Sequence, residues 1–66
     1  MTDLSTLMKD PDVIAFAERL VACQMKRDWR EMEKLKADLN SRSRLERDAI
    51  VQAWTRLAIE ARAPLA

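Results

Sequence analysis

Two residue types on which much enzymatic chemistry depends are missing from this sequence. Histidine and glycine are absent from the 66 residues, and Cys23 is the single cysteine. Without histidine, neither the common Ser-His and Cys-His nucleophiles nor the usual zinc ligand sets are available. Without glycine, the glycine-dependent phosphate-binding loops are missing, and tight turns that need a positive φ are disfavoured. We therefore expect no enzyme, no metal ion and no cofactor, and we expect Cys23 to pack as a small apolar side chain.

Basic side chains are the other group with possible chemistry, since arginine binds acidic surfaces and nucleic-acid phosphates. The formal net charge is only +1, but residues 26–47 hold eight basic residues against five acidic ones. This segment predicts polar or nucleic-acid contacts at Arg27, Arg30, Arg42, Arg44 and Arg47. The alternative is a solvated helix face, because acid–base pairs four residues apart, such as Arg56 and Glu60, support a helix.

The residues that must position these side chains are strong helix formers at helical spacing, which predicts an all-α fold in a single domain. One break is expected at Asp10-Pro11, because proline suits the first position of a helix and disfavours helix in the residue before it. A second break falls at residues 40–43, where Ser43 and Glu46 match the capping box that begins a helix. We expect a short arm or one helical turn over residues 1–10. A last helix over about residues 44–62 should stop before Pro64.

The segment between these breaks allows two interpretations. An apolar stripe that includes Ile14, Val21 and Leu39 continues through it and favours one long helix over residues 11–39. With the last helix, this arrangement is a helical hairpin. However, Asp28 and Glu31 also fit the start of a helix. A break near residues 27–28 would leave three short helices in place of the hairpin.

The apolar face of the last helix is unusually wide. Its alanines, with Ile50, Val51, Trp54 and Leu57, cover roughly 200° of the helix, whereas a surface helix normally shows about 100°. A single neighbouring helix covers only one side, so we expect a second polypeptide to complete the core, most simply as a homodimer with a four-helix arrangement. The predicted dimer or partner interface consists of Ile50, Ala53, Trp54, Leu57, Ala58, Ala61, Trp29, Met25 and Met32.

These features predict a small non-enzymatic regulator that binds another protein through its helical faces, as an adaptor, an inhibitor or a co-chaperone. Small helical proteins of phages, plasmids and secretion systems share this profile, by analogy of size and class. The alternative is a dimeric helical-hairpin regulator that binds nucleic acid through residues 26–47, similar to plasmid primer-repressor proteins in size and architecture only. No stretch is long and apolar enough to span a bilayer. The N-terminus lacks the basic and apolar regions of a secretory signal, so we expect a cytoplasmic protein that makes no membrane contact.

Overall fold

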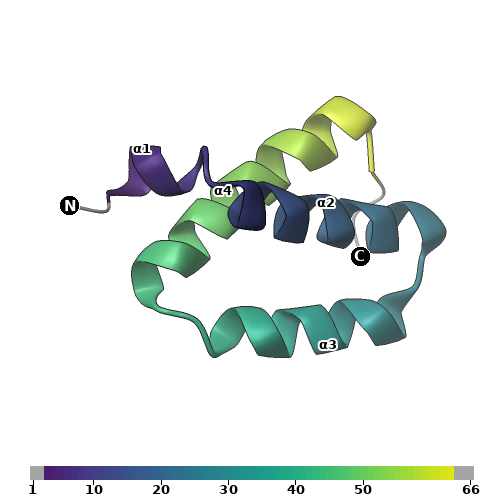
Figure 1. Cartoon of the computed structure of the whole chain (residues 1–66). Coiled ribbons are helices and arrows are strands. Elements are labelled where there is room, and N and C mark those ends of the chain that lie inside the picture. The colour runs from purple at the N-terminus through teal and green to yellow at the C-terminus, as the bar shows by residue number, and fades with distance from the viewer. Residues whose placement is uncertain (1–2, 64–66) are drawn as a thin grey trace.

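The computed structural model describes residues 3–63, which form four helices and no strand (Figure 1). Helix α1 covers Leu4–Leu7, α2 covers Pro11–Lys26, α3 covers Trp29–Asn40 and α4 covers Arg44–Ala61. The predicted all-α class is confirmed. Residues 1–2 of the expected N-terminal arm, and Pro64, the expected stop of the last helix, lie outside the described residues.

Both N-terminal helices begin at an aspartate. The Asp3 carboxylate accepts a 2.8 Å hydrogen bond from the backbone N–H of Thr6, which lowers the pKa of Asp3 below its ordinary value. The Asp10 carboxylate accepts a 2.9 Å hydrogen bond from the backbone N–H of Asp12, and a proline occupies the first position of α2 as expected. Leu7 of α1 is buried, and α1 packs against α4. The short first helix is therefore fastened to the core at its C-terminal end.

The prediction of one continuous helix over residues 11–39 is wrong. Helix α2 ends at Arg27, whose backbone is left-handed with φ 56° and ψ 35°. The N–H of Arg27 donates to the carbonyl of Gln24 at 3.1 Å, and the N–H of Asp28 donates to the carbonyl of Cys23 at 2.9 Å. This pair of bonds is a Schellman motif, which satisfies the last carbonyls of α2 and turns the chain.

The alternative break near residues 27–28 is confirmed, and its cause lies in the next residue. Asp28 is the N-cap of α3, and its carboxylate accepts a 3.2 Å hydrogen bond from the backbone N–H of Glu31. Two local signals, a C-terminal cap and an N-terminal cap, therefore outweigh the continuous apolar stripe. The turn forms although the chain has no glycine, because an arginine occupies the left-handed position that glycine usually fills.

The capping box at the start of α4 is present. The backbone N–H of Glu46 donates to Oγ of Ser43 at 3.3 Å, and this hydroxyl lies 3.2 Å from Oε1 of Glu46. The helix then runs to Ala61, within one residue of the predicted end. Arg62 caps it in the left-handed conformation with φ 53°, and the N–H of Ala63 donates to the carbonyl of Ala58 at 2.9 Å. Both long apolar helices thus end in a Schellman motif built on arginine.

The core lies between α2 and α4, which make the most extensive contact of the fold, while α3 packs mainly on α2 (Figure 1). Leu20 of α2 and Ile50 of α4 are the two largest fully buried side chains. The molecule measures 37 × 25 × 16 Å along its principal axes, so it is only about two helices thick. A body this thin leaves one side of α4 without a neighbour among the described residues. None of the helices in this range has the length and apolar character needed to cross a bilayer.

Candidate protein-binding surface

Helix α4 carries apolar residues on two opposite sides. Its inner side, with Ala49, Ile50 and Ala53, is buried in the core. On the outer side, Val51 is 42% exposed and Ile59 is 71% exposed. Thr55, Ala58 and Ile59 lie four, seven and eight residues after Val51, which places all four on one face of the helix. We call these four residues the outer stripe.

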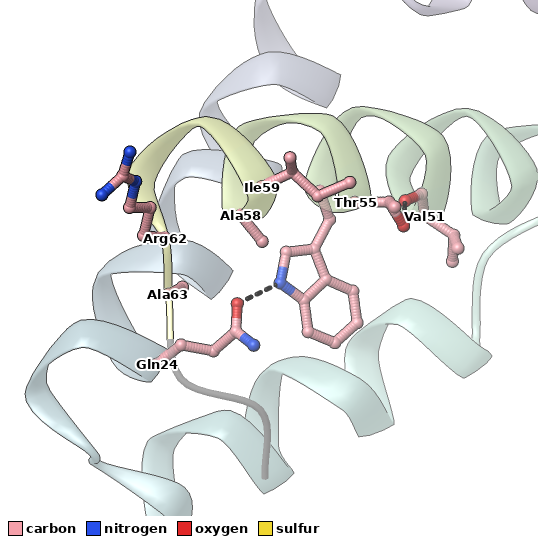
Figure 2. A pocket seen from close by; sticks show the side chains of 8 residues that line it. Gln24, Val51, Thr55, Ala58, Ile59, Arg62 and Ala63 are labelled. Carbon is pink, nitrogen blue, oxygen red and sulfur yellow. Dashed lines mark hydrogen bonds between the residues drawn. The ribbon is translucent and has the colours of Figure 1, made fainter.

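A groove of about 430 Å³ runs beside the outer stripe (Figure 2). Its lining is almost entirely apolar, and it joins the C-terminal half of α4 to the end of α2. The residues that line it are Gln24, Val51, Trp54, Thr55, Ala58, Ile59, Arg62 and Ala63. Grooves lined in this way, with a few fixed polar groups, are typical of binding sites.

A hydrogen bond between Trp54 and Gln24 fixes one wall of this groove. The indole Nε1 of Trp54 donates to Oε1 of Gln24 at 2.7 Å (Figure 2). Gln24 is only 5% exposed, so its amide is a buried polar group that needs hydrogen-bond partners. Trp54 provides one of them, and the bond connects the indole ring to the end of α2. The aromatic wall of the groove is therefore linked to the helix on its other side.

A second hollow, of about 550 Å³, lies on the other flank of the outer stripe. Val51, Thr55 and Ile59 line both hollows, so this part of the stripe forms a ridge between them. Helices pack when the ridge of one enters the groove of another. The outer side of α4 therefore has a ridge between two hollows, a surface shape against which another helix can pack.

The structure separates the predicted interface residues into three groups. Ile50, Ala53 and Met32 are buried inside this chain, where they pack in its own core. Trp54, Leu57 and Ala58 are half-buried at its edge, and Ala61, Met25 and Trp29 are exposed. The apolar arc of α4 is thus divided between a core face and an outer stripe.

Sequence reasoning missed Val51, Thr55 and Ile59 as surface residues of this site. Val51 was assigned to the wide apolar arc, and Ile59 lies outside that arc. The signal that identifies them is their spacing of four residues along one helix, which forms a second apolar row beside the first. Thr55 belongs to this row by its position, and its hydroxyl donates to the carbonyl of Val51 at 2.8 Å, so its polar group already has a partner.

The five arginines predicted to make polar or nucleic-acid contacts do not gather into one patch. Arg27 and Arg30 lie at the start of α3, whereas Arg42, Arg44 and Arg47 lie beyond its end. A helix of this length separates the two groups by about 18 Å. Arg42 is moreover engaged within the chain, by ion pairs to Asp38 and Glu46 at 3.6 and 3.4 Å and by the ring of Phe16.

Cys23 lies away from this surface, in the core. Burial raises the pKa of its thiol above the ordinary value, and the carboxylates of Asp28 and Glu31 raise it further. Raising the pKa keeps the thiol protonated, and a protonated thiol is a poor nucleophile. Within residues 3–63, no three histidine, cysteine, aspartate or glutamate side chains come together as ligands for a metal ion.

Comparisons with known proteins add no relative to this description. No protein-family model, no curated protein and no solved structure matches the chain.

Proposed function

We propose that this chain is a small protein-binding regulator, of the adaptor, inhibitor or co-chaperone type, and that it acts through the outer stripe of α4. The observation that carries the proposal is the ridge of Val51, Thr55 and Ile59, exposed between two hollows on a helix whose other side already fills the core. One exposed apolar residue needs no explanation, but a row of them beside an aromatic groove is typical of an interaction surface.

The free energy available on this surface favours a polypeptide partner. Complete burial of a Val or Ile side chain contributes about 1.5–3 kcal/mol, and both of these residues are exposed in the free chain. The indole of Trp54 adds a large rigid surface, and tryptophan is among the residues most enriched at interface hot spots. A partner helix that covers the ridge and fills the groove gains all three contributions together.

The polar groups of the groove support binding rather than catalysis. The Trp54 indole N–H is bonded to Gln24, and the Thr55 hydroxyl is bonded to the carbonyl of Val51. The remaining charged group is Arg62. This set contains no nucleophile beside a base, which acyl or phosphoryl transfer would require.

Site-specific photo-crosslinking tests the proposal. A photoreactive amino acid replaces Ile59 in the tagged full chain, expressed in the cells that the protein comes from. The matched control places the same amino acid at Ala37, an exposed apolar residue of α3. We expect crosslinks to a polypeptide from position 59 and none from position 37. The proposal fails if position 59 gives no polypeptide adduct, or if both positions capture the same mixture.

Binding to nucleic acid through residues 26–47 stays a prediction. Its arginines lie at the two ends of α3, and Arg42 is held by Asp38, Glu46 and Phe16. A salt titration of any RNA or DNA retention would test it, because phosphate contacts weaken steeply as salt rises.

A further inference from the structure

We infer that the polypeptide bound on the outer stripe is a second copy of this chain, with the two α4 helices antiparallel about a two-fold axis beside Thr55. The inference rests on the proposed function and names the partner of that same surface. Three observations carry it: the register of the stripe, the charges at its two ends and the shape of its flanks.

The register is that of a helix–helix seam. Asp48, Val51, Thr55 and Ala58 follow one another in α4 at alternating spacings of three and four residues, and Arg62, the residue that caps the helix, follows after four more. This alternation keeps side chains on one line along a helix and is the pattern of paired helices. Ala58 leaves room for a close approach, and Val51 supplies bulk. Asp48, Val51, Thr55 and Arg62 are exposed and Ala58 is half-buried, so the whole line faces outward from the core.

The two ends of the seam carry opposite charges at equal distances from its centre. Asp48 lies seven residues before Thr55, and Arg62 lies seven residues after it. Within residues 3–63, neither side chain forms an ion pair. Two antiparallel copies centred on Thr55 place Asp48 beside the partner's Arg62, and the two-fold axis makes this pair twice. A parallel arrangement would instead bring like charges together, which is destabilising.

The middle of the seam is self-complementary in shape. In the antiparallel register the two ridges lie side by side, with Val51 level with the partner's Ile59, so that each ridge enters a hollow that flanks the ridge of the other copy. Thr55 lies opposite the same residue of the other copy. Its hydroxyl already donates to the carbonyl of Val51, so burying this side chain leaves no unsatisfied donor. Such an interface uses the same surface patch on both copies, which closes the assembly at two chains.

A charge-reversal cycle on the full chain tests the inference by sedimentation equilibrium. The variants are Asp48→Arg, Arg62→Asp and the double variant that carries both. Glu33→Arg and Lys34→Asp, on exposed positions of α3, change the net charge by the same amounts and serve as controls. We expect the unchanged chain to dimerise at micromolar concentration. Each single reversal should weaken dimerisation about tenfold, because two attractive pairs become repulsive. The double variant should regain the original affinity, and the controls should retain it.

Several results would overturn the inference. A chain that stays monomeric at hundreds of micromolar has no such dimer. If the single reversals leave the dimer affinity unchanged, the dimer uses another surface. If the single reversals weaken dimerisation and the double variant does not restore it, the antiparallel register is excluded. Helicity and melting temperature of each monomer, measured by circular dichroism at low concentration, show that the variants are folded. If the chain is monomeric and position 59 crosslinks only to a different protein, the inference fails and the proposed function stands; without any adduct, both fail.

Discussion

The guanidinium carbon of Arg42 lies 4.7 Å from the centre of the Phe16 ring. Arg42 belongs to the turn between α3 and α4, and Phe16 is a buried residue of α2. The same guanidinium group forms ion pairs with Asp38 and Glu46. One side chain thus connects the last turn of α3, the first turn of α4 and the core face of α2, and this explains why an arginine expected to contact a partner is turned inward.

Replacing Arg42 by lysine should lower the free energy of unfolding by about 0.5–1 kcal/mol. Lysine keeps the charge but loses the planar group that stacks on the ring and reaches two carboxylates at once. Urea denaturation followed by circular dichroism measures the loss. Arg44→Lys is the control, because Arg44 is exposed and its replacement should leave the free energy of unfolding unchanged. Equal effects of the two substitutions would show that the contact with Phe16 contributes nothing.

Replacing Trp54 by phenylalanine should cost about 1 kcal/mol, because it removes the hydrogen bond to the buried Gln24 but keeps most of the apolar volume. Replacement by alanine should cost about 3 kcal/mol, at the lower end for a large aromatic residue, because Trp54 is only half-buried. Chemical denaturation of the monomer at low concentration gives both values. Trp29→Phe serves as the control, since Trp29 is exposed and has no hydrogen-bond partner among the described residues. If Trp54→Phe and Trp29→Phe had the same stability, the indole–amide bond would be of no consequence.

Arg27→Gly should stabilise the protein. Arg27 is held at φ 56°, a region that costs an L-residue about 1–2 kcal/mol and glycine almost nothing. Glycine also increases the entropy of the unfolded chain, so the net gain should be about 0.5–1 kcal/mol. This gain corresponds to a rise of a few degrees in melting temperature. Arg30→Gly, in the first turn of α3, should instead lower the melting temperature, because glycine weakens a helix. A lower melting temperature for Arg27→Gly would contradict the left-handed cap.

Stability should fall at alkaline pH because of Cys23. Its pKa in the folded chain is raised above the ordinary value near 9.0, first by burial and then by the charges of Asp28 and Glu31. The folded state therefore holds the thiol proton at a pH at which the unfolded state has lost it. The stabilisation from this difference is complete below the unfolded pKa and is lost as the pH rises through the folded pKa. Urea unfolding gives the free energy of unfolding of the unchanged protein and of Cys23→Ala at each pH from neutral to 10. Plotted against pH, the two free energies should converge above pH 9. Parallel curves would show that the thiol titrates alike in both states.

Capping residues in this sequence predicted the helix boundaries better than apolar periodicity did. Asp10, Asp28 and Ser43 each begin a helix, and each is readable because a short polar side chain must accept a backbone N–H there. The apolar stripe over residues 11–39 was misleading, because α2 and α3 both turn their apolar side to one core and so continue the same pattern across a turn. Nothing in the sequence marked Arg27 as a left-handed residue, since arginine carries no preference for that conformation.

The candidate surface was predicted only in part. The wide apolar arc predicted apolar side chains on more than one side of α4, and Val51 is indeed exposed while Ile50 is buried. That a second chain covers the outer side stays a prediction. The arc did not distinguish the residues that enter the core, such as Ile50, from those that remain outside, such as Val51. That division depends on which side of α4 meets α2, and the crossing is set by tertiary packing between segments far apart in the chain.

The crossing of α4 over α2 also constrains the order in which the chain can fold. Leu20 and Ile50, the two largest fully buried side chains, belong to these two helices, and the whole of α3 separates them in sequence. Isolated helices of this length are marginal in water, so α2 and α3 gain little order before α4 is available. During synthesis, the growing chain should stay open and accessible to proteases until α4 has left the ribosome. A single cut in the turn before α4 should likewise release two pieces, neither of which folds alone.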